Sequence, residues 1–146
     1  MAPYPLKQPE DFDGLVIHCS DPRFQEAFQR FVTEELGMQC PAKIIIPGGI
    51  HDLMLPARIK AARHIKQWIE FLTKELNLHR IVIINHEGCR WYEHWNTLVA
   101  TPIGHDITHH LLEVRKILAI HRLNVNIETY LAKIEEGEVV FQKVTG

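Results

Sequence analysis

Residues 80–89 read RIVIINHEGC and hold the most apolar strand-length run of the chain. Four consecutive isoleucine and valine residues favour a strand that is buried on both faces, as strands of a parallel sheet are. This strand, Arg80–Asn85, leads directly into His86, and Cys89 follows three residues later. The segment therefore predicts a central strand with chemically active side chains at its carboxyl end.

The rest of the chain alternates between strand-like and helix-like segments. Further strands are expected at Leu15–Cys19, Ala42–Ile46, Val125–Leu131 and Glu138–Val144. Helices are expected at Phe24–Leu36, Pro56–Leu76 and Trp91–Leu98, and over a segment that contains Ile107 and Leu118. Glu136-Gly137 is a suitable hairpin turn between the last two strands. This order predicts an α/β fold with a mostly parallel central sheet, helices on both faces and a C-terminal antiparallel edge hairpin.

With 146 residues, of which 46% are apolar, the chain is long enough for a single domain over 1–146, with an N-terminal arm at 1–13. The net charge of -2, without a long block of either sign, argues against nucleic acid and membrane surfaces as partners and suits a small neutral or anionic substrate. The apolar runs are too short to span a membrane, and the arm lacks the pattern of an export signal. Three cysteines, an odd number, favour a reducing compartment. We therefore expect a soluble, cytoplasmic protein.

A second reactive segment, Cys19–Arg23 (CSDPR), directly follows the strand that begins at Leu15. Together with His86 and Cys89 it supplies two thiolates and an imidazole, a ligand set that suits Zn²⁺ in tetrahedral geometry. Because parallel sheets bind ligands at the carboxyl ends of their strands, these side chains are expected to meet there. Three protein ligands leave a fourth position open, which is the pattern of a catalytic zinc site.

The two segments resemble the zinc site of β-class carbonic anhydrases, in which C-x-D-x-R and H-x-x-C segments end neighbouring strands and hold one catalytic zinc. The resemblance implies an enzyme with one Zn²⁺ per chain that reversibly hydrates CO₂ to bicarbonate and a proton. By this likeness Cys19, His86 and Cys89 are the metal ligands. Asp21, paired with Arg23, orients the nucleophile, or moves onto the metal as a fourth ligand in an inactive closed form. The family likeness also implies a homodimer or a higher even oligomer.

The chain departs from the pattern of that family at four places. Pro22 stands where serine is common, and Arg90 stands where a glycine usually follows the second cysteine. The stretch before Pro47 is longer than usual, and Pro47–Ile50 replaces a family segment that shapes the active-site wall. The N-terminal arm, which in many members wraps a partner subunit, is short. These departures motivate a second hypothesis, a non-catalytic zinc-binding domain of the same fold with a structural or regulatory role.

A third hypothesis is a metal-free cysteine enzyme, in which Arg23 and a helix N-terminus lower the pKa of Cys19. The spacing between these two residues is too short for the cysteine loop of phosphatases. Simpler roles also exist for single residues. Asp21 fits a helix N-cap, because Pro22 suits the first helical position. Cys40 is most simply a small buried or semi-buried side chain.

Histidines elsewhere offer weaker functional candidates. The group His105, Asp106, His109 and His110 looks like a second metal cluster, but it more simply forms the polar start of a helix. His51 is a better candidate for a proton shuttle because of its position after a glycine turn, and Asp52 accompanies it.

The aromatic and glycine-rich segments near the motifs are expected to be structural. Residues 47–49 (PGG) lack phosphate-loop spacing, so they are expected to turn the chain, with a backbone N–H that faces the site. Trp91, Tyr92 and Trp95 are expected to pack in the core or at a subunit interface, because aromatic residues at such spacing mostly bury area.

Overall fold

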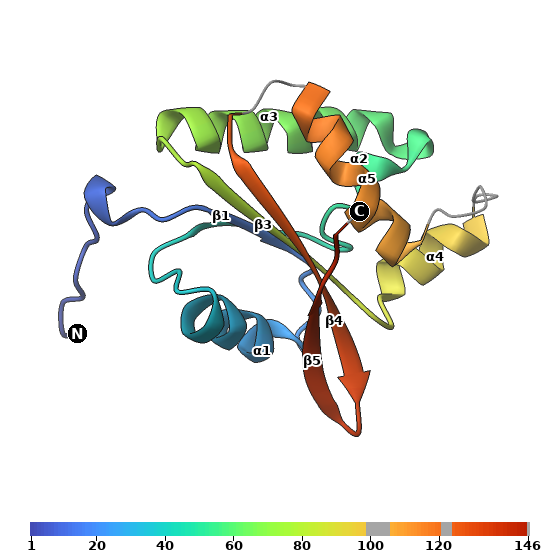
Figure 1. Ribbon diagram of the computed structural model, residues 1–146, viewed down its shortest axis with the longest axis horizontal. Coiled ribbons are helices and arrows are strands. Elements are labelled where there is room, and N and C mark those ends of the chain that lie inside the picture. Colours follow the sequence, from blue (N-terminus) through green and yellow to red (C-terminus); the bar gives the residue numbers. More distant parts are fainter. Residues whose placement is uncertain (99–105, 121–123, 146) are drawn as a thin grey trace.

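The computed structural model describes residues 1–98, 106–120 and 124–145. Its centre is one sheet of five strands in the order β2-β1-β3-β4-β5 (Figure 1). The strands are β1 Leu15–His18, β2 Ala42–Ile45, β3 Arg80–His86, β4 Asn126–Glu135 and β5 Glu138–Lys143. β1 pairs in parallel with β2 and β3, β3 pairs in parallel with β4, and only β4 and β5 pair antiparallel. The predicted α/β class, with a mostly parallel sheet and a C-terminal hairpin, is confirmed.

The hairpin is longer on its first strand than the sequence pattern predicts. β4 continues to Glu135, four residues beyond the predicted end at Leu131, and its last residues pair with β5 up to Glu138. The turn is the expected Glu136-Gly137, and both residues have positive φ, 51° and 78°. Such a turn matches the right-handed twist of the two strands, so pairing extends to its edges.

β1 and β3 form the buried middle of the sheet. Every residue of β1 is buried, and β3 is buried from Ile81 to its end. Side chains of alternate residues point to opposite faces, so Ile81 and Ile83 join one apolar cluster while Val82 and Ile84 join the other. This double burial is what the continuous isoleucine and valine run of the sequence indicates.

Helices cover both faces of the sheet, as Figure 1 shows with α3 and α5 above it and α1 below it. The upper cluster includes Ala62, Ile65 and Ile69 of α3 (Ile59–Glu75), together with residues of α2 (His51–Met54) and α5 (Ile107–Ile120). The lower cluster includes Phe28 of α1 (Gln25–Arg30). α4 (Arg90–Leu98) lies at the carboxyl end of β3.

Two helix predictions need correction, and one short helix was not predicted. The single helix expected over 24–36 is α1 followed by a π-helical stretch at Phe31–Glu35, and the chain leaves it at Gly37, with φ +71°. The helix expected from Pro56 begins with a 3-10 turn, Pro56–Arg58, before α3. The short helix α2 carries no separate signal in the sequence, because the preceding glycines mask its beginning.

The N-terminal arm runs away from the body of the protein (Figure 1), and its first eleven residues are exposed. Asp13 fixes the base of the arm, because its carboxylate accepts hydrogen bonds from the backbone N–H groups of Gln39 and Cys40.

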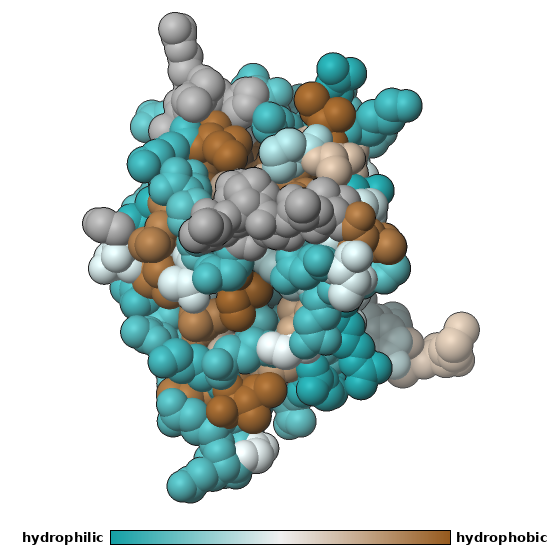
Figure 2. Space-filling view, turned by 90° about the vertical axis from the view of Figure 1, so that its right-hand side faces the viewer, coloured by the Kyte–Doolittle hydropathy of each residue, from teal (hydrophilic) through white to brown (hydrophobic). Residues whose placement is uncertain are grey.

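The face that carries α4 shows separate apolar patches among polar side chains (Figure 2). Among the described helices, none is both long and apolar enough to cross a bilayer. His105, a member of the histidine group singled out in the sequence, lies outside the described residues.

Candidate metal centre

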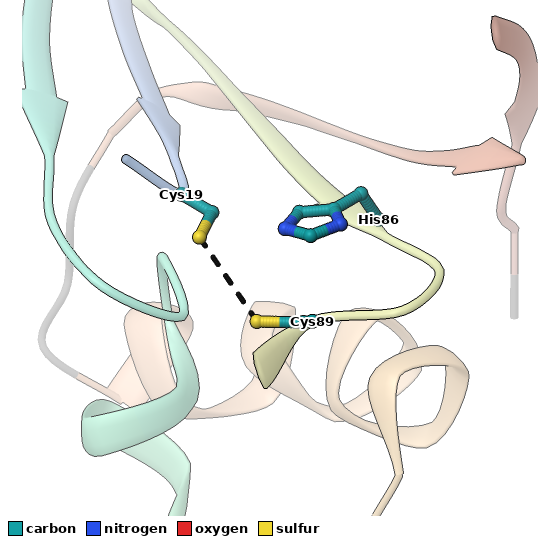
Figure 3. Close-up of side chains that lie close together, drawn as sticks. All are labelled: Cys19, His86 and Cys89. Atoms are coloured by element: carbon teal, nitrogen blue, oxygen red, sulfur yellow. Dashed lines mark hydrogen bonds between the residues drawn. The ribbon is translucent and has the colours of Figure 1, made fainter. Parts of the chain in front are cut away.

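Three side chains from the two sequence motifs converge at the carboxyl edge of the sheet. Cys19 directly follows β1, His86 is the last residue of β3, and Cys89 lies just before α4. Their ligand atoms all lie within 4.8 Å of one another, and the three residues are 7%, 1% and 4% exposed. Figure 3 shows both sulfur atoms and the imidazole facing a common point. They meet because β1 and β3 are parallel neighbours that end at the same edge of the sheet.

The residues around His86 present one ring nitrogen for binding. Nδ1 donates a hydrogen bond to the backbone oxygen of Glu87 over 2.7 Å. Nε2 is buried and has no hydrogen-bond partner among the described residues. Because a buried polar atom without a partner is costly, this nitrogen calls for a ligand. A backbone carbonyl that holds the opposite ring nitrogen is the usual support of a metal-binding histidine.

The loop between His86 and Cys89 is anchored to the neighbouring strand. Glu87 donates its backbone N–H to Ala132 and accepts the N–H of Ile134 with its carboxylate. Both partners belong to β4, which fixes the direction in which the loop leaves the sheet. A site with two sulfur donors and one nitrogen donor in this compact arrangement suits Zn²⁺. The residues present therefore fit a single zinc ion.

The two thiols are electrostatically linked. Cys19 Sγ and Cys89 Sγ lie 4.0 Å apart, and the backbone N–H of Gly48 donates to Cys19 Sγ over 3.3 Å. Donation from the Cys89 thiol lowers the pKa of Cys19 to about 4, whereas the same contact, reinforced by burial, raises the pKa of Cys89. Without a cation the two thiols thus share one proton, which stays on Cys89. A divalent cation favours the form in which both are thiolates.

The turn at residues 47–49 packs against this centre. Gly48 and Gly49 have φ of +74° and +57°, a backbone region that glycine adopts without strain. A Cβ on Gly48 would lie 2.5 Å from Trp91 Cδ1, so no other residue fits without movement. The predicted backbone N–H facing the site is confirmed, because Gly48 provides it.

Asp21 and Arg23 form a forked ion pair beside the thiols. Arg23 Nη2 lies 2.8 Å from Asp21 Oδ2, and Arg23 Nε lies 3.2 Å from each carboxylate oxygen. The Arg23 guanidinium holds the pKa of the Asp21 carboxyl below its usual range, so Asp21 is ionised. Arg23 Nη2 also donates to the backbone oxygen of Gly88, over 3.1 Å.

The expected N-cap role of Asp21 is wrong. The helix begins at Gln25 rather than at Pro22, because residues 22–24 form a turn. Asp21 Oδ1 instead accepts the backbone N–H of Arg23 over 2.9 Å within that turn. This local contact competes with helix formation and keeps the carboxylate at the sheet edge.

An open cleft of about 520 Å³ lies in front of the centre. Its lining includes Cys19, Asp21, Arg23, Arg90 and His94. The last two were not singled out as candidate site residues, although their four-residue spacing on a helix directly after Cys89 places them on one helix face. The cleft gives small molecules access to Cys19 and to the Asp21–Arg23 pair.

His51 and Asp52 lie behind the glycine turn and not among the residues that line the cleft. His51 is 2% exposed, and its Nδ1 donates to Asp52 Oδ1 over 2.8 Å. Asp52 also accepts hydrogen bonds from Arg58 and from the indole of Trp91, each over 2.9 Å. The two residues therefore belong to a buried network, and a proton-shuttle role for His51 stays a prediction.

The predicted polar start of a helix after residue 105 is confirmed. Asp106 Oδ1 accepts the backbone N–H groups of Thr108 and His109 and so caps α5. His110 is buried, and its Nδ1 and the Tyr92 hydroxyl share a hydrogen bond of 2.7 Å. Within the described ranges, the cysteine and histidine group at 19, 86 and 89 is the cluster with metal-ligand geometry. Tyr92 packs against both cysteines, as expected of a core aromatic residue.

Comparison with known proteins gives matches in structure only. No protein-family model matches the sequence, and no curated protein matches it. A β-carbonic anhydrase, isoform I of Trichomonas vaginalis, superposes with a TM-score of 0.51 at 15% identity, covering 97% of this chain and 86% of the other. The β-carbonic anhydrase CcaA gives 0.47 at 18% identity, over 90% and 79% of the two chains. That of Aspergillus fumigatus, CafA, gives 0.42 at 16%, over 90% and 74%. From the first of these likenesses and the sheet order, the chain has a β-carbonic-anhydrase-like fold.

Proposed function

We propose that this protein is a zinc-dependent enzyme that reversibly hydrates CO₂ to bicarbonate and a proton. The observation that carries the proposal is the convergence of Cys19, His86 and Cys89 beside the Asp21–Arg23 pair, next to an open cleft that Cys19 lines. Two thiolates and one imidazole would hold one Zn²⁺ per chain, with a coordination position left for substrate. When bound, zinc supplies the Lewis acidity that turns water into a nucleophile near neutral pH.

In this proposal Asp21 orients the nucleophile. An ionised carboxylate offers about four lone-pair sites. Three N–H groups of Arg23 (its backbone N–H, Nε–H and one on Nη2) donate to Asp21, and Nε–H is shared between the two oxygens, so the donors are fewer than the sites. Asp21 can therefore accept one further hydrogen bond from the attacking oxygen and so direct a lone pair of that oxygen at the carbon of CO₂. Arg23 keeps the carboxylate ionised and prevents its rotation. The closed form, with Asp21 as a fourth ligand, would require Arg23 to release it.

A stopped-flow assay of CO₂ hydration at pH 7 and pH 8.5, together with metal analysis, tests the function. We expect about one zinc per chain and hydration that is faster at the higher pH, because two thiolates neutralise the metal and make its water less acidic. Asp21→Asn should retain zinc and lose about 10²-fold in rate, the scale of a lost orienting partner. Asp11→Asn, a matched change on the exposed arm, should have no effect.

The same measurements distinguish the rival hypotheses. About one zinc per chain with no hydration at either pH would support a non-catalytic zinc-binding module. Parent-like activity of Asp21→Asn would refute the orienting role. Absence of zinc from protein purified without chelators, with a rapidly alkylated Cys19, would instead support a metal-free cysteine enzyme.

We further propose a homodimer or higher even oligomer in the cytoplasm. Large apolar side chains remain exposed on the isolated chain, with Phe71 at 63%, Trp68 at 45% and Ile45 of the edge strand β2 at 43%. Such surfaces favour burial against a second copy. All three cysteines are free, which suits a reducing compartment. Sedimentation equilibrium gives the mass directly, and a monomer at micromolar concentration would contradict the assembly.

A further inference from the structure

Arg90 is a cation in the cleft that the proposed reaction does not use. It is the first residue of α4, follows the proposed ligand Cys89 and lines the cleft with its side chain exposed. No residue in the described part of the chain forms a hydrogen bond or an ion pair with its guanidinium. The other arginine of the cleft, Arg23, is paired with the Asp21 carboxylate and also donates to the backbone oxygen of Gly88. Arg90 therefore has donors available for a ligand.

His94 stands beside Arg90 on the same helix face. It lies four residues later on α4, and both side chains line the cleft. The imidazole of His94 stacks on the Trp91 ring, with 5.7 Å between ring centroids and an interplanar angle of 25°. Trp91 also lines the cleft, and its indole N–H is held by Asp52. One wall of the cleft thus consists of a guanidinium and an imidazole supported by a fixed aromatic ring.

The charges around the cleft leave Arg90 uncompensated. Asp21 and Arg23 cancel each other, and two thiolates would cancel a divalent metal. Glu93, on the first turn of α4, acts on Arg23 and is not among the residues that line the cleft. The N-terminus of α4, where Arg90 lies, adds a partial positive charge. The cleft therefore has a net positive charge next to the proposed metal.

We propose that Arg90 and His94 form an anion-binding subsite for a small carboxylate-type anion. A guanidinium donates two parallel N–H groups and so matches the two neighbouring oxygens of such an anion. CO₂, which is neutral and linear, does not offer two oxygens on one side. The choice of bicarbonate as the natural ligand rests on the proposed function, whereas the subsite itself does not. In that function Arg90 holds bicarbonate close to the metal, before dehydration and after hydration.

The test is a proton NMR titration of the zinc-loaded protein with sodium bicarbonate, and separately with sodium acetate, at constant pH and ionic strength. The imidazole C–H signal of His94, assigned with His94→Gln, reports on the subsite itself. We expect Arg90→Gln to weaken binding of both anions by about five- to tenfold, the scale of one charge-assisted contact in an open cleft. Arg63→Gln removes the same charge from an exposed site on α3 and should change the dissociation constants less than twofold.

Two results would overturn the subsite: Arg90→Gln that binds both anions as the parent does, or Arg63→Gln that weakens binding as much as Arg90→Gln. Zinc content and circular dichroism verify that each variant is folded. Should Arg90→Gln fail to fold, Arg90→Lys replaces it, and partial weakening is expected because lysine keeps the charge without the fork. Arg90-dependent binding in a protein that does not hydrate CO₂ would overturn the proposed function alone. Hydration together with Arg90-independent binding would overturn the subsite alone.

Discussion

Arg23 Nη2 donates both to Asp21 Oδ2 and to the backbone oxygen of Gly88, which lies 65 residues further along the chain. One guanidinium therefore joins the two motifs that supply the proposed metal ligands. The contact to Gly88 holds the loop between His86 and Cys89, while the contact to Asp21 holds the carboxylate beside Cys19. Loss of Arg23 should therefore disturb the orientation of both motifs more than it disturbs the packing of the core.

Arg23→Gln is expected to lower CO₂ hydration by about 10- to 100-fold while the protein keeps its zinc, because the ligands remain and only their supports are lost. Stopped-flow rates and metal content on the same samples check this. Arg23→Lys should recover little, since lysine cannot form the fork to Asp21. Arg30→Gln, at the last residue of α1, breaks an exposed pair with Glu34 and serves as the control. Equal losses of hydration rate in Arg23→Gln and Arg30→Gln would show that the effect is not specific to the site.

Cys89→Ser should reduce zinc to less than about one tenth per chain, since a hydroxyl is a poor replacement for a thiolate ligand. If zinc binds as proposed, it would stabilise the parent by about 4 kcal/mol when free metal exceeds the dissociation constant a thousandfold, and the variant should lose most of this. Thermal unfolding with and without a chelator measures the difference. Cys40→Ser is the matched control, because Cys40 lies outside the cluster. A Cys89→Ser protein with full zinc would remove Cys89 from the ligand set.

The sequence was sufficient to predict the centre of the fold and of the site because both depend on local patterns. The apolar run at residues 81–84 indicates a strand buried on both faces, and in the structure this strand, β3, lies next to β1. Side chains directly after two such strands then share an edge of the sheet, so Cys19 and His86 meet although they are distant in sequence. The hairpin followed from Glu136-Gly137 in the same way.

The parts that escaped prediction depend on contacts across the fold. The helix after Asp21 starts late because the Asp21 carboxylate accepts hydrogen bonds from both the backbone N–H and the guanidinium of Arg23. The support of the second motif by Arg23 passes through the backbone oxygen of Gly88, which no side-chain pattern reports. Arg90 and His94 became site candidates only when the cleft showed which face of α4 is turned toward it.

The metal-free protein should contain one persistent thiolate. Because the Cys89 thiol and the Gly48 N–H donate to Cys19, the pKa of Cys19 falls to about 4, so its thiolate should persist from neutral pH down to that region. Absorbance near 240 nm, followed against pH after removal of zinc, measures it, with Cys40→Ser as background to exclude the third thiol. Cys89→Ala removes the thiol donor and should move the transition to higher pH. A transition only above pH 8 in the parent background would contradict this account.

Asp52 should contribute stability that is lost in acid. Burial alone would raise its pKa, but donors from His51, Arg58 and Trp91 outweigh burial and lower the pKa from 3.8 to about 2. A carboxyl whose pKa is depressed on folding stabilises the protein above the unfolded pKa, and this stability disappears as pH falls through the folded pKa. The shift corresponds to about 2.5 kcal/mol, and solvent screening reduces it to about 1–2 kcal/mol. Asp52→Asn should therefore be less stable by that amount at pH 6, and the difference from the parent should shrink between about pH 4 and pH 2. Urea unfolding of both proteins across this range measures the difference, and a gap that stays constant down to pH 2 would show that the charge of Asp52 is not what stabilises the network.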